Sequence, residues 1–230
     1  MSLFSSDEEL LATLRRELYT AVVGDVMDAM GLLDQFLPPS IQPLQDDVLL
    51  AGRAMPVLEA DDCGGEGPGR ATAELNRPFG LMLRALDELQ THEVYLATGS
   101  SPRYAMWGEL MSAAAKNRGA AGAVVDGYAR DTRGILALGF PCFCMGRYAR
   151  DQRPRGKVLD FRCAVEIEGV RVWPGDLIFG DLEGVCVVPR EAVDEVIPAA
   201  LKKARGEKTV HEAIRGGMGA QEAWEAYGIM

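Results

Sequence analysis

The 230-residue sequence is poor in histidine and in basic residues. Its two histidines, His92 and His211, leave little material for a histidine-rich metal site. Asp and Glu together number 34 against 24 Lys and Arg, which gives a net charge of −10 and a field that repels nucleic acids. We therefore expect no nucleic-acid partner, and we expect an anionic small ligand to need local basic groups or a bound cation.

Long apolar runs and closely paired cysteines are also absent from the sequence. No stretch approaches the ~20 apolar residues that span a membrane, and the acidic, amphipathic segment 1–18 does not resemble a secretory signal. We therefore expect a cytoplasmic protein without a membrane partner. No CxxC pair occurs, so we interpret the cysteines as buried free thiols rather than as redox or zinc ligands: Cys63, Cys142, Cys144, Cys163 and Cys186.

The composition is that of a soluble globular chain, with 48% apolar and 25% charged residues. N-terminal helices are expected over about residues 7–31, a core over about 50–190 and C-terminal helices over about 190–228. Within the core, strands and helices alternate and then give way to consecutive strands, which predicts parallel followed by antiparallel pairing. We predict one α/β domain over residues 1–230, a three-layer α/β/β-type arrangement with a mixed sheet.

Local signals place several boundaries. Ser6 precedes three acidic residues and is expected to cap the first helix, Thr20 is expected to cap the second, and Gly31 is expected to end it. The strand expected over 52–60 carries Pro56, which predicts a position at a sheet edge or a bulge.

The most glycine-dense segment, DDCGGEGPGR at 61–70, allows two interpretations. It could cradle a phosphate, but the third glycine of a GxGxxG pattern falls one residue early and no GKS or GKT follows. A surface loop, able to cover a neighbouring site, is the simpler interpretation.

Two acids follow neighbouring strands of the predicted parallel sheet. Glu109 opens the helix expected over 108–118, and Asp131 follows the strand expected over 122–126, 22 residues later. Ligands gather at the carboxyl ends of parallel strands, so both acids and the adjacent Arg130 should face one crevice. Two carboxylates suit Mg²⁺ or Mn²⁺, an arginine fork suits a carboxylate or enolate, and the N–H groups over 108–111 suit an anion.

The same residues also have a purely structural interpretation. Asp131 could cap its helix, Glu109 could be a first-turn acid, and Arg130 could pair with either. Spacing alone does not choose between this interpretation and a catalytic one.

The segment GELMSAAAKNRGAAGAVVDGYARD resembles the core of the class II pyruvate aldolases that act on 4-hydroxy-4-methyl-2-oxoglutarate, a family that includes the RNase E regulator A proteins. The resemblance extends from YTAVVGDVMDAMG through GFPCF to the C-terminal ARGEKTVHEAIRGGMGAQEAWEAYGIM, and so covers most of the chain. Two features depart from the family pattern: Glu109 stands where aspartate is usual, and the glycine-rich segment differs.

The resemblance implies a role for each residue of the motif. Arg130 would contact the pyruvyl group and stabilise its enolate, Asp131 would bind Mg²⁺ or Mn²⁺ directly, and Glu109 would hold that ion through water. The backbone amides that follow Gly108, at Glu109, Leu110 and Met111, would bind the substrate carboxylate. Glu207 would reach the site of a neighbouring subunit in a trimer or a hexamer of paired trimers, although it could equally be a solvated acid near a helix end.

These expectations combine into a metal-dependent lyase. It would cleave a 4-hydroxy-2-oxo acid to pyruvate, or decarboxylate oxaloacetate, through a stabilised pyruvate enolate. The alternative is a non-catalytic regulator that binds an RNA-processing enzyme. A methyltransferase is rejected, because the glycine-rich strand-to-helix fingerprint with an acid at the next strand end is missing.

Overall fold

The helices and strands follow the predicted order in the computed structural model, which describes residues 3–62 and 75–229. The helices are α1 (Asp7–Glu17), α2 (Thr20–Ala29), α3 (Met82–Asp87), α4 (Glu109–Asn117), α5 (Thr132–Leu138), α6 (Val193–Arg215) and α7 (Ala220–Tyr227). The strands are β1 (Gln42–Pro43), β2 (Leu50–Asp61), β3 (Glu93–Thr98), β4 (Ala105–Trp107), β5 (Gly122–Ala129), β6 (Cys142–Arg147), β7 (Gly156–Phe161), β8 (Val165–Ile167), β9 (Val170–Val172), β10 (Leu177–Asp181) and β11 (Gly184–Val188).

One mixed sheet runs in the order β1-β6-β5-β3-β2-β10-β11, with β4 beside β5 and β7 beside β2. Strands β2, β3, β5 and β6 are parallel, and β10 and β11 are antiparallel, which confirms the predicted change of pairing. The two ends of the sheet also meet, because Leu37 N–H donates to Val185 O (2.9 Å) and Val187 N–H donates to Gln35 O (2.8 Å). The sheet therefore nearly closes into a barrel.

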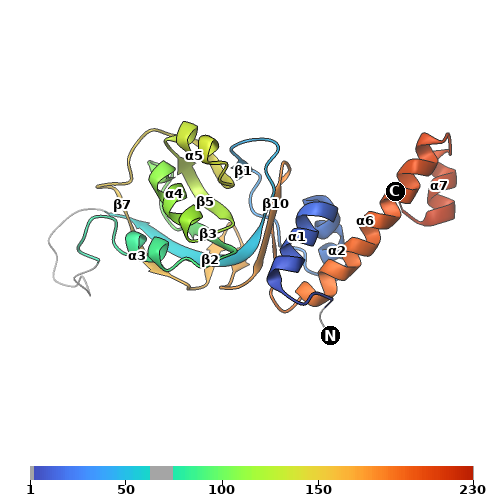
Figure 1. Ribbon diagram of the computed structural model, residues 1–230, viewed down its shortest axis with the longest axis horizontal. Helices are drawn as coiled ribbons and strands as arrows, with labels where there is room; N and C mark the ends of the chain where they lie inside the picture. Colours follow the sequence, from blue (N-terminus) through green and yellow to red (C-terminus); the bar gives the residue numbers. More distant parts are fainter. Residues whose placement is uncertain (1–2, 63–74, 230) are drawn as a thin grey trace.

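Three apolar clusters hold the elements together. Helices α3, α4 and α5 cover the outer face of the parallel strands, and α1, α2 and α6 pack against β2, β10 and β11 (Figure 1). The third cluster lines the inside of the curved sheet and is completed by the β8–β9 hairpin. The predicted α/β domain with a mixed sheet and terminal helices is confirmed.

The N-terminal helices show one confirmed cap and one error. The Ser6 hydroxyl accepts from Glu9 N–H (3.2 Å), as predicted. Thr20 does not cap α2, since it lies inside the helix and its hydroxyl donates to Asp181 on β10 (2.8 Å). The Thr20 hydroxyl, which the sequence predicts as a helix cap, is therefore hydrogen-bonded to the buried carboxylate of Asp181. Gly31 follows the end of α2 with a φ of 81°, as predicted for a residue that stops a helix.

Of the two positions that Pro56 predicts, a sheet edge is wrong, whereas β2 does carry a register shift between Leu58 and Glu59, two residues after the proline. Strand β2 is central, with β3 on one side and β10 and then β7 on the other. Ala54 N–H donates to Asp176 O before the proline, and Arg162 N–H donates to Pro56 O after it. The proline therefore falls where β2 changes partner on one side, so its missing N–H leaves no ladder bond unmade.

Two other boundaries differ from the expected ones. The strand expected to end at residue 126 continues to Ala129, because Asp126 accepts from the Thr98 hydroxyl (2.7 Å) and Gly127 leaves room for Met106. The segment 160–168 is two strands rather than one, since the chain turns at Arg162 (φ 57°).

The cysteines agree with the prediction where the structure describes them. Cys142, Cys144 and Cys186 are buried free thiols, and Cys163 is half-buried. Cys63 and most of the glycine-rich segment lie outside the described residues.

The C-terminal helices form an arm. Helix α6 packs against α2 and then leaves the body of the molecule, and α7 lies beside its far end (Figure 1). Among the described residues, no helix is long and apolar enough to cross a membrane.

Candidate functional site

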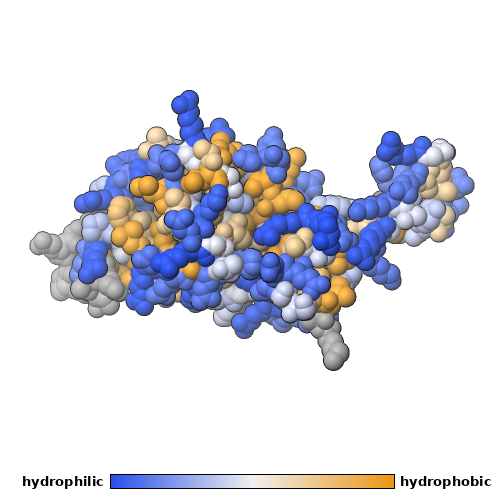
Figure 2. All heavy atoms as spheres, in the orientation of Figure 1, coloured by the Kyte–Doolittle hydropathy of each residue, from blue (hydrophilic) through white to orange (hydrophobic). Residues whose placement is uncertain are grey.

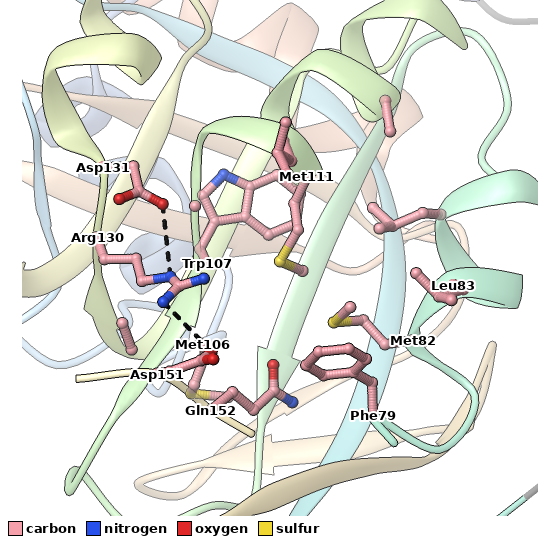
Figure 3. Close-up of a pocket in the computed structure, with 15 residues that line it drawn as sticks. Phe79, Met82, Leu83, Met106, Trp107, Met111, Arg130, Asp131, Asp151 and Gln152 are labelled. Atoms are coloured by element: carbon pink, nitrogen blue, oxygen red, sulfur yellow. Dashed lines mark ion pairs between the residues drawn. The ribbon is translucent and has the colours of Figure 1, made fainter. Parts of the chain in front are cut away.

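A pocket of about 280 Å³ opens between α3, α4 and the carboxyl end of β5 (Figure 3). It lies where the topology rule for parallel strands places a ligand. Five of the residues predicted from the sequence line it: Gly108, Leu110, Met111, Arg130 and Asp131.

Arg130 lies between two carboxylates of the pocket. Its Nε is 3.4 Å from Asp131 Oδ2, and its Nη1 is 3.4 Å from Asp151 Oδ1 (Figure 3). Its backbone N–H donates to Trp107 O (2.9 Å), which ties the end of β5 to β4. The guanidinium is therefore oriented from both sides and keeps donors available for a bound anion.

Two parts of the structural interpretation hold, because Glu109 lies in the first turn of α4 and Arg130 pairs with Asp131. The third part is wrong, because the side chain of Asp131 does not cap its helix. It precedes α5 in the left-handed region (φ 52°, ψ 35°), and its side chain makes no capping bond. That conformation costs an L-residue about 1–2 kcal/mol, and such outliers gather at functional sites. The carboxylate points into the pocket instead of toward the N–H groups of α5 (Figure 3).

The start of α4 presents backbone donors to the same pocket. Gly108 precedes the helix without a side-chain cap, and the first helical bond runs from Ser112 N–H to Gly108 O (3.0 Å). The Ser112 hydroxyl donates to the same carbonyl (3.1 Å) and accepts from Trp107 Nε1 (2.7 Å). This buried network fixes the helix start, so the preceding N–H groups form a prepared anion site. A Cβ at Gly108 would lie 3.3 Å from Asp131 Oδ2, so glycine allows the close approach.

Glu109 and Glu207 do not line the pocket. The Glu109 carboxyl lies against Gly134 in the first turn of α5, where a Cβ would clash with it. Glu207 accepts from the Tyr19 hydroxyl and lies 3.9 Å from Lys203, on the arm side of the molecule. The structure thus brings Arg130 and Asp131 together with the start of α4, whereas Glu109 faces α5. The predicted role of Glu207 belongs to a neighbouring subunit and stays a prediction.

The donor chemistry of the pocket fits a hard divalent cation at Asp131. Mg²⁺ typically binds through one or two carboxylates and takes its other ligands from water and substrate. In the part of the chain that the structure describes, no group of three or more His, Cys, Asp or Glu could hold a metal ion. Asp131 would therefore be the protein ligand of such an ion, and water and substrate would supply the other ligands.

The structure adds polar residues that sequence reasoning missed. Asp151 and Gln152 enter the pocket from the segment between β6 and β7 (Figure 3). Neither follows a predicted strand or belongs to a motif, so only the path of the chain brings them there.

A buried carboxyl lies behind Gln152. Gln152 Nε2 donates to Glu59 Oε2 (3.2 Å), while Glu59 Oε1 and the Tyr95 hydroxyl have no hydrogen-bond partner within the described structure. Burial raises the pKa of Glu59 to about 8, so the carboxyl is largely protonated at neutral pH. Burial also raises the pKa of Tyr95 well above its ordinary value, and the nearby Glu59 adds to the effect.

Asp61 anchors the loop that leads to the pocket. It accepts from Ser101 N–H (3.0 Å), from Arg103 Nη2 (2.6 Å) and from the Tyr104 hydroxyl (3.1 Å). The Ser101 hydroxyl and the Arg103 guanidinium are the main causes that hold the pKa of Asp61 well below its ordinary value. The segment that leads from β3 into β4 is therefore fixed from strand β2.

Comparison with known proteins identifies related chains and structures. Residues 20–187 match the family described as "RraA-like: Aldolase/RraA". A relative from Halalkalibacterium halodurans, named "Putative 4-hydroxy-4-methyl-2-oxoglutarate aldolase", is 32% identical over 201 residues, which make up 86% of either chain. Protein DlpA of Legionella pneumophila is 28% identical over 209 residues, 90% of this chain but 32% of DlpA, so the present chain spans a minor part of that protein.

A solved structure shares the fold. Streptomyces coelicolor RraAS2, described as an unusual member of the RNase ES inhibitor RraA protein family, aligns with a TM-score of 0.75 at 24% identity, covering 90% of this chain and 97% of that one. From the family match and the shared fold, the chain belongs to the RraA-like (Aldolase/RraA) family.

Proposed function

We propose that this protein is a divalent-metal-dependent lyase that releases pyruvate from a 4-hydroxy-2-oxo acid, such as 4-hydroxy-4-methyl-2-oxoglutarate, or from oxaloacetate. One observation carries the proposal: Arg130, Asp131 and the open start of α4 meet in one pocket. The N–H groups at the start of α4 suit the carboxylate of a 2-oxo acid, and Arg130 supplies a permanent positive charge for its 2-oxo group. Asp131 suits a divalent cation.

The residues divide the work of cleavage. The N–H groups at the start of α4, at Glu109, Leu110 and Met111, bind the substrate carboxylate. Arg130 faces the 2-oxo group and offsets the charge of the enolate as it develops. Asp131 would hold Mg²⁺ or Mn²⁺ directly, and Glu109, from outside the pocket lining, would hold the ion through water. When bound, the ion would supply Lewis-acid polarisation.

The bond changes are the same for both substrates. In retro-aldol cleavage the 4-hydroxyl proton passes to a water held by the pocket acids, the C3–C4 bond breaks, and its electron pair forms the pyruvate enolate. In oxaloacetate decarboxylation the C3–C4 bond breaks, the C4 carboxylate leaves as CO₂, and the electron pair forms the same enolate. Protonation at C3 then yields pyruvate. Among the described residues that line the pocket there is no histidine, which is consistent with a water as the proton carrier.

The test is a coupled assay of pyruvate release over a panel of 4-substituted 2-oxo acids and oxaloacetate. We expect turnover with Mg²⁺ or Mn²⁺, none in excess EDTA, and none with Arg130→Ala. Failure to release pyruvate from any of these compounds with either metal would contradict the lyase. That result would favour the alternative, a non-catalytic regulator of an RNA-processing enzyme.

We also propose that the chain forms a trimer or a hexamer in which Glu207 reaches a neighbouring pocket. The support is the arm: α6 carries Glu207 on the side of the molecule away from α3 and α4 (Figure 1). Glu207 is therefore directed away from the pocket of its own chain, and the pocket that it would enter belongs to another subunit.

A further inference from the structure

The pocket has a polar end and an apolar end. Arg130, Asp131 and Asp151 lie together on one side, and Phe79, Met82 and Leu83 face them across the pocket (Figure 3). Met111 extends the apolar side from α4. A pyruvyl group placed at Arg130 would therefore direct its C4 substituent toward side chains without charge.

Helix α3 supplies Met82 and Leu83 to the apolar end, and its cationic residue, Arg84, contacts groups outside the pocket. Arg84 Nε donates to Glu88 Oε1 (2.8 Å), and the Arg84 guanidinium lies 5.9 Å from the centroid of the Phe161 ring. Arg84 lines a separate hollow with Arg77 and Arg153, on the other side of Phe79 and Leu83. Among the described residues that line the main pocket, Arg130 is the only cation.

The rim of the apolar end exposes large hydrophobic side chains. Leu110 is 84% exposed and Leu83 is 59% exposed. Figure 2 shows hydrophobic residues gathered on the face that α3 and α4 occupy in Figure 1. An apolar substituent would remove part of this surface from water, whereas a carboxylate there would lose hydration without gaining a cation. Methionine side chains also adapt to ligands of different shape.

We infer that this pocket selects 2-oxo acids whose C4 substituent is apolar, either aromatic or branched aliphatic, over those that carry a second carboxylate. The inference rests on the proposed function and specifies its substrate class. For such a substrate, R–CH(OH)–CH₂–CO–COO⁻, the 4-hydroxyl proton passes to the water of the pocket, the C3–C4 bond breaks and its electron pair forms the pyruvate enolate. A proton then adds at C3, and the products are the aldehyde R–CHO and pyruvate.

The first experiment measures binding without turnover. The probes lack the 4-hydroxyl group and cannot be cleaved: 2-oxo-4-phenylbutanoate, 2-oxoglutarate and 2-oxoadipate, titrated calorimetrically with Mg²⁺ present. We expect the phenyl compound to bind at least ~10-fold more tightly than either dicarboxylate, as expected for burial of an aromatic group. Equal or tighter binding of 2-oxoglutarate would overturn the inference. Equal or tighter binding of 2-oxoadipate would also overturn the inference, because it would indicate that the distal carboxylate reaches the arginine-lined hollow.

The second experiment moves a cation into the apolar end. Leu83→Lys changes an exposed side chain, so the fold should survive, and it should lower the affinity for 2-oxo-4-phenylbutanoate while raising that for 2-oxoglutarate. Leu182→Lys is the matched control, since Leu182 is 55% exposed on the turn between β10 and β11 and does not line the pocket. An identical response of the two variants would contradict the assignment of the apolar end.

Turnover separates this inference from the proposed function. Cleavage of 4-hydroxy-2-oxo-4-phenylbutanoate should exceed that of 4-hydroxy-4-methyl-2-oxoglutarate in kcat/KM. Faster cleavage of the dicarboxylate would leave the lyase standing and overturn the substrate class. Tight binding of the phenyl probe without any pyruvate release would do the reverse.

Discussion

At the scale of single residues, the pocket depends on Arg130 and Asp131, which adjoin in sequence but serve different ends. Arg130 is oriented by Asp131 and Asp151 through contacts of 3.4 Å each, which are long for direct hydrogen bonds. The two carboxylates therefore orient the guanidinium, and its N–H donors stay available for a ligand. Asp131 is held in a backbone conformation that its own helix does not require.

Arg130→Lys should retain the fold and lose most turnover. Lysine keeps the charge but loses the planar fork, and a charge-assisted hydrogen bond of ~1.5–3 kcal/mol corresponds to about a 10- to 150-fold fall in kcat. Arg118→Lys, at an exposed arginine paired with Asp87, is the control. Steady-state kinetics with thermal melts would test this, and near-native kcat in the Arg130 variant would exclude the catalytic role.

Replacing Asp131 with alanine or with glycine should separate activity from stability. Both variants lose the carboxylate, so both should lose metal-dependent pyruvate release. Glycine accepts a φ of 52° without strain, so the glycine variant should be about 0.5–1 kcal/mol more stable than the alanine variant. Urea unfolding of the two proteins measures the difference. Equal stabilities would mean that the left-handed conformation carries no cost here.

At the scale of secondary structure elements, Glu59 links the centre of the sheet to the pocket. It lies on β2 and accepts from Gln152, which precedes β7 and lines the pocket. The neighbouring ionisable groups are Tyr95 on β3 and Tyr104 before β4, and neither is a cation. A neutral carboxyl is the form that this environment favours.

The free energy of unfolding should fall as the pH rises from about 4.5 to about 8. The folded chain keeps the Glu59 proton up to a pKa of about 8, whereas the unfolded chain releases it near the ordinary value of 4.5. The folded state thus binds one proton more in that window, and stability declines by about 1.4 kcal/mol per pH unit, or roughly 5 kcal/mol across it.

Glu59→Gln should remove this dependence, because the amide has the shape of the protonated acid and cannot ionise. Relative to the native protein, the variant should gain stability between pH 5 and pH 8. Glu88→Gln, at an exposed acid on the surface of the same body, should leave the pH profile unchanged. Denaturant unfolding at several pH values provides the comparison, and parallel curves for Glu59→Gln and the native chain would refute the expectation.

At the scale of the whole molecule, α3 and α4, which line the pocket, and the arm formed by α6 and α7 lie on different sides of the body (Figure 1). Glu207 on α6 contacts Tyr19 and Lys203 of its own chain, and burial raises the pKa of Glu207 above its ordinary value. If a neighbour's pocket receives this residue, the interface is head-to-tail, since each subunit presents two different patches.

Mixing two inactive variants tests that arrangement. Glu207→Ala and Arg130→Ala should each be nearly inactive, and a mixture dissociated and reassembled should recover turnover, because some interfaces then combine an intact Arg130 with an intact Glu207. Each variant reassembled alone is the control. Native kinetics for Glu207→Ala would show that the residue is a surface acid worth less than about 1 kcal/mol.

The sequence by itself determined the features that depend on neighbouring residues. Ser6 and Gly31 predict helix ends through backbone hydrogen bonding and positive φ, and the alternation of strands and helices predicts the parallel part of the sheet. It also places Arg130 and Asp131 at the end of a strand and Gly108 at the start of a helix, and these residues do line one pocket. The helix ends and the order of strands and helices are local properties, set within a few residues along the chain. The parallel pairing and the shared pocket follow from that order through the topology rule for parallel strands.

Only the tertiary structure decided which distant groups meet. Asp151 enters the pocket, Thr20 donates to Asp181 rather than capping α2, and Pro56 lies in a central strand where the partner changes. Glu109 reaches Gly134 in the first turn of α5 and does not line the pocket. The physical reason is common to these cases. A side chain's partner is set by the packing of elements far apart in sequence, and burial then fixes its hydrogen bonds and its charge, as at Glu59.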